Sequence, residues 1–196
     1  MTEDPAPRRL QTPLSPEEVQ RLAVGDPVLL DGVIYAARDA AHARLVQGLQ
    51  GREEPPIPLE GQVIFFVGPT PARPGQVIGS IGPTTASRMD CYSPVLIARG
   101  LRGMIGKGKR APEVREAMRR HGCVYFGAVE GNAALLARQV RAAEVVAYPD
   151  LGPEAIYRFL VEAFPVIVVN DVAGRDLYEE GRARYAQAVD EGAGTG

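Results

Sequence analysis

The second half of the chain alternates strand-like and helix-like segments, and this order constrains the fold more than any single motif. It opens with a short apolar strand over 103–106 and a helix over roughly 112–121. The segments that follow are predicted as strand, helix, strand, helix, strand and helix, at residues 123–129, 132–143, 144–151, 152–164, 165–171 and 175–189. Strands joined by helical crossovers pair in parallel. The pattern therefore predicts an α/β fold with a mixed, partly parallel sheet.

The first half has more strand character. A helix over 14–22 begins with a capping box, in which Ser15 precedes Pro16 and Glu18 follows three positions later. Asp31-Gly32 separates two apolar runs and predicts a hairpin turn. Further on, we expect a helix at 38–49, strands at 62–68 and 73–82, and either a helix or a buried run at 91–100.

Composition narrows the class of protein. With 196 residues, 45% of them hydrophobic and 23% charged, the chain can bury one core. The net charge of -2 gives no reason to expect nucleic acid or an acidic membrane as partner. No apolar run approaches the ~20 residues of a membrane helix, and a cytoplasmic protein is expected. We expect flexible tails at 1–12 and 187–196 around a single domain at 13–186.

Basic and hydroxyl residues gather at the boundaries between predicted elements. They are Arg38, Thr84, Thr85, Arg88, Lys107 and Lys109. In parallel α/β sheets, ligands bind beyond the carboxyl ends of the strands, where such loops lie. Arginine can hold a carboxylate through two parallel hydrogen bonds. Arg38, Thr84, Arg88 and Lys107 therefore form a candidate site for an anion with more than one carboxylate.

Each of these residues also has a plainer interpretation. Thr84 or Thr85 can be a helix N-cap, Arg88 a surface charge, and the GKGKR segment a solvated turn. The segment is not a nucleotide-binding P-loop, because Leu101 stands where the first glycine is required and Gly108 follows the lysine.

Histidines and cysteines give weaker signals. His42 lies at helical spacing from Arg38, so it faces either the same cleft or solvent. His121 ends a helix and is interpreted as structural. Cys91 and Cys123 lack metal-ligand spacing and are expected to be reduced packing residues, with no metal bound.

Four segments in order resemble one family. GPTTASRMD is similar to the GPTTxxRMD signature of the β subunit, or C-terminal domain, of class I fumarases and L-tartrate dehydratases. ARDAAH, MIGKGKR and the YPDLGPEAI to FPVIVVND stretch are similar to further segments of that family. The resemblance covers about Leu10 to Asp176. Ser87, where many members have glycine, and Ala37 are small departures.

The resemblance implies a fold and an activity. The fold is a swivelling three-layer β/β/α domain, and the activity is reversible addition of water across the C=C bond of a dicarboxylic acid. A partner α subunit would carry an oxygen-sensitive [4Fe-4S] cluster, in an assembly of two α and two β subunits. Because three cysteines hold such a cluster and this chain has two, this chain would bind no cofactor and be inactive alone.

The resemblance also assigns roles. Arg38, Arg88 and Lys107 would bind substrate, and Thr84 would transfer the proton. A threonine hydroxyl is a poor base, so it needs stabilisation by nearby cations or by N–H groups at a helix start. The supporting candidates are Thr85, Asp90, Lys109 and His42. Hydration of fumarate to L-malate is the leading function, and an L-tartrate dehydratase β subunit or a non-catalytic small-anion-binding module are the alternatives.

Overall fold

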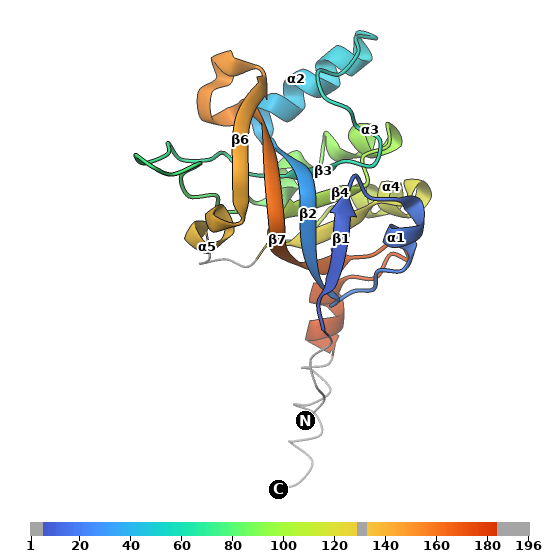
Figure 1. Cartoon of the computed structure of the whole chain (residues 1–196). Helices are drawn as coiled ribbons and strands as arrows, with labels where there is room; N and C mark the ends of the chain where they lie inside the picture. The colour runs from blue at the N-terminus through green and yellow to red at the C-terminus, as the bar shows by residue number, and fades with distance from the viewer. Residues whose placement is uncertain (1–5, 129–132, 184–196) are drawn as a thin grey trace, which may run out of the picture.

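A computed structural model describes residues 6–128 and 133–183 (Figure 1). The strands are β1 (Arg8–Thr12), β2 (Pro27–Ala36), β3 (Val63–Phe65), β4 (Gly103–Gly106), β5 (Val124–Gly127), β6 (Val140–Ala147) and β7 (Ile156–Asn170). The helices are α1 (Pro16–Gln20), α2 (Asp39–Gln50), α3 (Ser93–Ala98), α4 (Pro112–His121) and α5 (Ala133–Arg138), with 3₁₀ segments η1 (Ala86–Met89) and η2 (Pro149–Glu154). Residues 177–183 are also helical. The tail expected at 187–196 lies outside the described residues.

The seven strands form one sheet that closes on itself. β2, β3, β4 and β5 pair in parallel in that order. β7 runs antiparallel to both β5 and β2 and so completes the ring. β1 pairs in parallel with β2, and β6 pairs antiparallel with β7. The prediction of an α/β fold with a mixed, partly parallel sheet is therefore confirmed.

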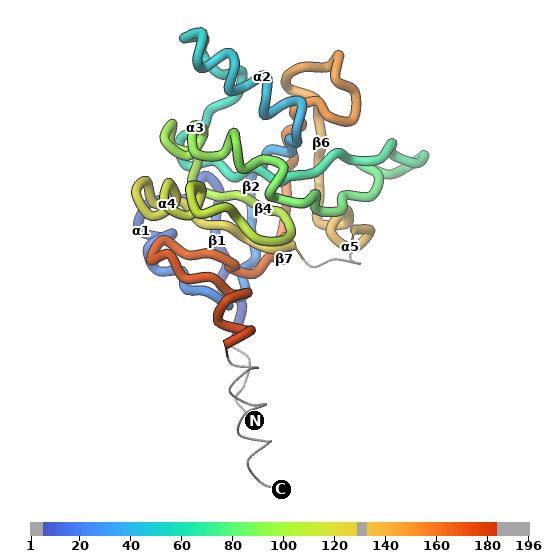
Figure 2. Tube along the Cα trace, turned by 180° about the vertical axis from the view of Figure 1, so that it is seen from behind, coloured from blue at the N-terminus to red at the C-terminus, as the bar shows by residue number. Residues whose placement is uncertain are grey.

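Alternating side chains of the strands divide the core into two layers. Phe65 points into the interior of the ring, where its side chain meets Phe164 edge-on with centroids 5.6 Å apart. Its neighbours Ile64 and Phe66 point the other way and pack beneath the helices. Figure 2 shows α2, α3 and α4 stacked along that side. The result is two β layers and one helical layer, while the swivelling motion stays a prediction.

Local signals fix several helices as expected. Ser15 Oγ accepts the N–H of Glu18 at 3.2 Å, and the Glu18 carboxylate accepts the N–H of Ser15 at 2.8 Å, which completes the predicted capping box. α4 ends at His121, and the next residue, Gly122, has φ of 69°, the left-handed conformation common after a helix. The ambiguous segment at 91–100 contains α3. No helix among the described residues is long and apolar enough to cross a membrane.

Two predictions fail at one place in the sheet. The hairpin expected at Asp31-Gly32 lies inside the continuous strand β2, opposite a β-bulge in β7: Leu30 pairs with Phe164 and Gly32 with Val161, so β7 carries one extra residue there. The helix expected at 152–164 is mostly β7, which pairs with β2 from Tyr157 to Ile167. Asp31 Oδ1 accepts the N–H of Ala163 at 2.9 Å across the two strands. Gly32 has φ of 100° and Ala163 has φ of 50°, so both strands are irregular where they meet.

Three further boundaries differ from the sequence predictions. Residues 8–12, expected in a tail, form β1 and bury Leu10 against the core. The helix expected at 132–143 ends at Arg138 within the described part, and β6 begins at Val140. Residues 73–82 contain no strand and belong to a long loop, tied where the N–H of Thr70 donates to the Ser80 carbonyl at 3.1 Å.

Candidate anion-binding site

The predicted site residues follow the carboxyl ends of neighbouring parallel strands. Arg38 lies between β2 and α2, and Lys107 directly follows β4. Thr84 is held beside the end of β3, because its N–H donates to the carbonyl of Phe66 at 2.7 Å. The N–H of Lys107 donates to the Thr84 carbonyl at 3.4 Å. Segments far apart in the sequence thus meet at one end of the parallel strands, as the topology of such folds favours.

One carboxylate joins the two arginines. Asp39, the first residue of α2, places Oδ2 3.1 Å from Arg38 Nε and Oδ1 2.8 Å from Arg88 Nε. Arg38 also lies 3.5 Å from Glu154 Oε1, and the other oxygen of Glu154 accepts the N–H of Ala40 at 3.1 Å. The Arg38 and Asp39 side chains are about one quarter exposed and that of Arg88 about half exposed, at 26%, 25% and 52%. The two guanidinium groups are therefore linked and still open to solvent.

The threonine segment and the lysine loop extend the sheet as a short parallel pair. Thr85 bridges to Lys107, and the N–H of Ala86 donates to the Lys107 carbonyl at 2.9 Å. An open cavity of 510 Å³ lies beside this pair. Its lining residues are Thr85, Gly106, Lys107, Gly108, Gly127, Ala128 and Tyr178. Lys109, a supporting candidate, is exposed on the same loop.

The helix after the threonines is a single 3₁₀ turn. Its N-cap residue is Thr85, and the Thr85 side chain makes no capping hydrogen bond. Thr84 lies one residue further from the turn, so the interpretation of either threonine as a side-chain cap is wrong. A four-residue turn also has few aligned peptide dipoles, and it cannot supply the positive helix end expected to assist Thr84.

Asp90 does not belong to the arginine cluster. Its Oδ1 lies 2.7 Å from Nε of Arg110, whose side chain has no exposed surface. Arg110 also donates to Ser93 Oγ at 2.6 Å and lies between the rings of Phe66 and Tyr125, 5.2 and 5.1 Å from their centroids. Asp90 is therefore the partner of a buried cation that braces the segment after the threonines. No local pattern indicates that Arg110, at the end of a basic loop, would be buried.

His42 lies in the core and not in a cleft. Its side chain is fully buried, and burial lowers the pKa of the imidazole to about 4, so the ring is neutral near pH 7. Nδ1 donates to the carbonyl of Arg38 at 3.0 Å, and the ring meets Phe66 edge-on. Nε2 has no hydrogen-bond partner among the described residues. His42 therefore supports the turn that carries Arg38 from beneath.

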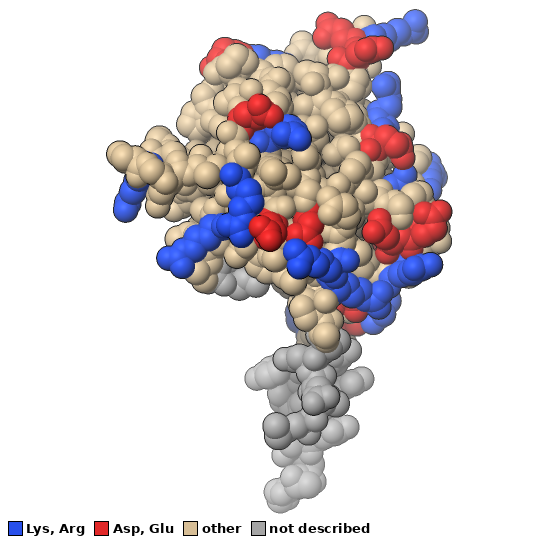
Figure 3. Space-filling view, in the orientation of Figure 1, with Lys and Arg blue, Asp and Glu red and all other residues tan. Residues whose placement is uncertain are grey.

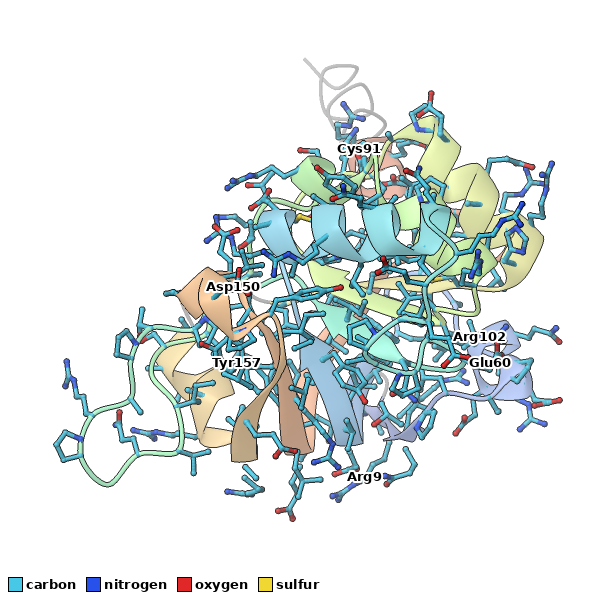
Figure 4. The ribbon with its side chains drawn as sticks, turned by 90° about the horizontal axis from the view of Figure 1, so that it is seen from above. Arg9, Glu60, Cys91, Arg102, Asp150 and Tyr157 are labelled. Atoms are coloured by element: carbon cyan, nitrogen blue, oxygen red, sulfur yellow. The ribbon has the colours of Figure 1, made fainter. Side chains whose placement is uncertain are left out.

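The cysteines occupy different environments. Cys91 is exposed, which contradicts its assignment as a packing residue (Figure 4). Cys123 is buried as expected, and burial raises the pKa of its thiol to about 12. In the part of the chain that the structure describes, no three His, Cys, Asp or Glu side chains are grouped closely enough to hold a metal ion.

Comparison with known proteins gives the chain its family. The family model described as Fumarase C-terminus matches residues 4–181. The chain is 38% identical to the anaerobic class I fumarate hydratase of Escherichia coli K12 and 35% identical to fumarate hydratase 2 of Leishmania major, over 83% and 84% of its length. It spans only 30% and 29% of those two proteins. It is also 36% identical to a Methanocaldococcus jannaschii protein provisionally named L(+)-tartrate dehydratase subunit beta, with 91% of this chain and 94% of that protein covered. The chain belongs to the Fumarase C-terminus family.

Proposed function

We propose that this chain is the β subunit of a heteromeric hydro-lyase that hydrates fumarate reversibly to L-malate. The observation that carries the proposal is the pair of arginines joined through Asp39, at the strand ends where Thr84 and Lys107 also lie. Membership of the Fumarase C-terminus family supports the same reaction class. The names of the relatives from Escherichia coli and Leishmania major favour fumarate as the substrate.

Substrate binding is assigned to the three cations. Fumarate and malate each carry two carboxylates, and Arg38 and Arg88 can each offer parallel N–H groups to a carboxylate. Lys107 adds a compact positive charge on the neighbouring strand end. The arginine side chains are partly open to solvent, so a small anion can reach them before a partner covers this end of the molecule.

Proton transfer is assigned to Thr84. Hydration adds a hydroxyl to one carbon of the double bond and a proton to the other, and the reverse reaction removes that C–H proton. Negative charge then builds on the adjacent carboxylate, where a bound arginine stabilises it. The Thr84 hydroxyl needs positive charge nearby to act as a base, and Lys107 and Arg88 are the groups in its neighbourhood that can supply it.

The side chains of this chain do not fit a [4Fe-4S] cluster. It has two cysteines, and Cys123 is buried with a raised thiol pKa that disfavours the thiolate form needed for a ligand. We therefore assign the cluster, and the chemistry that it supplies, to a partner α subunit. In this proposal two α and two β subunits assemble, and the isolated β subunit does not turn over.

An L-tartrate dehydratase β subunit is the second candidate. The provisionally named Methanocaldococcus jannaschii relative favours it, since the two chains match over nearly their full lengths. Tartrate also has four carbons and two carboxylates, so the same cations would serve. The third candidate, a non-catalytic small-anion-binding module, needs the arginines but not the threonine hydroxyl.

Reconstitution tests these candidates. The chain is co-expressed without oxygen with the cluster-bearing α subunit of the same source, and cluster content is measured by absorbance and iron analysis. Fumarate hydration and tartrate dehydration are then assayed, and succinate binding is measured by calorimetry. We expect fumarate turnover, and tartrate turnover would select the second candidate. A loaded complex that binds succinate without turning over either acid would indicate the binding module. A loaded complex that neither binds nor reacts would overturn the proposal.

A further inference from the structure

Asp39 touches both arginines of the candidate site and has no assigned role. Its two oxygens contact the Nε atoms of Arg38 and Arg88, at 3.1 and 2.8 Å, so one carboxylate holds both side chains. Arg38 precedes Asp39 in sequence, whereas Arg88 comes from the segment after the threonines. The contact therefore fixes the relative position of two cations from separate parts of the chain.

The Nε contacts leave the far edge of each arginine available. Within the described residues, neither Arg38 nor Arg88 donates a hydrogen bond from an Nη atom to a protein acceptor. An arginine held at Nε still presents two parallel N–H groups from its Nη atoms, which match the two oxygens of a carboxylate. Asp39 thus orients the guanidinium groups without using the edges that would bind an anion.

Helix α2 and Glu154 support Asp39 and its arginine partner. Asp39 is the first residue of the 12-residue helix α2, where a negative charge interacts well with the helix N-terminus. Glu154, from the connection between β6 and β7, accepts the N–H of Ala40 at 3.1 Å and approaches Arg38 Nε at 3.5 Å. A short aspartate on a helix also loses less side-chain entropy on being fixed than the long arginines do. Helix α2 and Glu154 together therefore hold the bridge in place.

We propose that Asp39 is a positioning residue, which sets the separation and orientation of Arg38 and Arg88 so that one four-carbon dicarboxylate binds both. This inference rests on the proposed function, because it takes the two arginines as the substrate-binding groups. It adds a residue that acts through the arginines and does not itself touch the substrate.

The direction in which Asp39→Asn changes the affinity for dicarboxylates separates a positioning role from a simple effect of charge. Asp39→Asn keeps the size of the side chain and removes one negative charge. If the site attracted anions by charge alone, the variant would bind dicarboxylates more tightly. If Asp39 positions the arginines, the variant binds them more weakly despite its greater positive charge. Asp39→Glu keeps the charge and displaces the carboxylate by one methylene, so positioning predicts weaker binding here too, whereas a charge effect predicts no change.

The chain offers a matched control on the same helix. Arg44 of α2 forms a two-bond ion pair with Asp150 of η2, at 2.8 and 2.7 Å, and Asp150 is labelled in Figure 4. Asp150→Asn changes the net charge by the same amount and also breaks an ion pair between α2 and η2. It leaves the contacts of Arg38 and Arg88 intact. Its binding and turnover should equal those of the wild type.

The experiment uses the assembled complex with its α subunit. Calorimetry with succinate gives the Kd, and fumarate hydration gives KM and kcat. For Asp39→Asn and Asp39→Glu we expect Kd and KM to rise roughly tenfold, the size expected when a hydrogen bond to a charged group is weakened, with kcat changed less than KM. Unchanged or tighter binding in Asp39→Asn, with Asp150→Asn behaving as wild type, would overturn the inference and leave the proposed function intact.

The wild-type complex and a second variant cover the remaining outcomes. If wild-type complex neither binds succinate nor hydrates fumarate, the proposed function fails and this inference fails with it. If Asp39→Asn does not fold, as judged by circular dichroism, Glu154→Gln serves as the test instead. Glutamine retains an acceptor for the Ala40 N–H and removes the charge near Arg38. We expect it to raise the succinate Kd by a smaller factor, and an unchanged Kd would reject the positioning network.

Discussion

Arg110 and Asp90 form an ion pair inside the protein, with 2.7 Å between Nε and Oδ1 and no solvent exposure of the arginine side chain. The second oxygen of Asp90 accepts the N–H of Ala111 at 2.9 Å, just before α4. The pair therefore connects the threonine segment to the end of the lysine loop. It holds the two backbones that carry Thr84 and Lys107 in register, although neither partner faces the anion site.

Breaking this pair from one side should be costly. Asp90→Asn leaves Arg110 buried without a counter-charge, and we expect a loss of about 3–5 kcal/mol in the free energy of unfolding. Arg110→Met should also destabilise, but the double variant should lose less than the sum of the two. Denaturant unfolding of all four proteins measures the coupling. Strict additivity would show that the two side chains do not interact energetically.

Thr84→Ala should affect turnover far more than folding. The contacts that hold Thr84 are made by its backbone N–H and carbonyl, and no side-chain cap is lost. We expect kcat of the assembled complex to fall by roughly 10²–10⁴, the usual contribution of a proton-transfer group, with the unfolding free energy changed by about 0.5 kcal/mol or less.

Two variants control the Thr84 experiment. Thr84→Ser keeps a hydroxyl and should retain most of the activity. Ser87→Ala removes an exposed hydroxyl from the same segment and should leave kcat unchanged. If Thr84→Ala turned over like Ser87→Ala, the proton-transfer role would have to be given up.

His42 predicts a loss of stability in mild acid. Its pKa is about 4 in the folded protein and near 6.5 in the unfolded chain, so the unfolded state binds the additional proton. The contribution of neutral His42 to the free energy of unfolding is fully present above pH 6.5. It declines as the pH falls and is lost by about pH 4. At pH 5 the loss is roughly 2 kcal/mol, from 1.36 kcal/mol per pH unit.

Comparison with His42→Leu isolates this effect from the titrating carboxylates. Leucine fills a similar volume and cannot titrate. Denaturant unfolding should show that the unfolding free energy of wild type, minus that of the variant, decreases from pH 7 to pH 5. A difference that stays constant with pH would mean that His42 is not the group responsible.

Gly32 lies in β2 opposite the bulge of β7 and should not tolerate a side chain. Its φ is 100°, and a Cβ at this position would lie 2.7 Å from Thr12 Oγ1 and 2.9 Å from the Thr12 carbonyl oxygen. Gly75 has a similar φ of 79°, but a Cβ there would have no atom within 4 Å. Both Gly→Ala variants carry the backbone strain, of order 1–3 kcal/mol, and only Gly32→Ala adds the clash. Thermal unfolding should rank Gly32→Ala below Gly75→Ala, and equal effects would contradict the steric argument.

The same bulge explains why two sequence predictions were wrong, the hairpin at Asp31-Gly32 and the helix at 152–164. Asp31-Gly32 has the composition of a tight turn, but here it continues β2 and faces the extra residue of β7, where the Ala163 N–H donates to Asp31. In β7 the inward side chains are Phe159 and Val161 before Ala163, then Phe164, Val166 and Val168 after it. The irregularity changes the parity of the strand, so the apolar residues adopt a spacing that resembles a helix. Local patterns cannot reveal a bulge that a distant strand stabilises.

The candidate site was partly predictable for a related reason. Arg38, Thr84 and Lys107 could be assigned to one end of the fold, because loops after parallel strands share that end. The burial of His42 and the bridging role of Asp39 could not be predicted. Both depend on how α2 sits against Phe66 and the threonine segment, which is a tertiary property.

Charged pairs on the outer strands are a further feature that only the structure reveals. Figure 3 shows Lys and Arg next to Asp and Glu over the face that β6 and β7 contribute to. Arg158 pairs with Glu144, and Arg141 pairs with Glu162, each across the two strands. Exposed pairs of this kind contribute little to stability, about 0–1 kcal/mol each.

The closure of the sheet by β7 has a consequence for how the chain acquires its structure. Pro27 of β2 pairs with Ile167 of β7, 140 positions later in the sequence. Contacts between such distant residues form slowly, because a long loop must be ordered first. During synthesis on the ribosome, β2 cannot pair with β7 until nearly the whole domain has been synthesised. Its unpaired edge is the surface that a chaperone would have to shield in that interval.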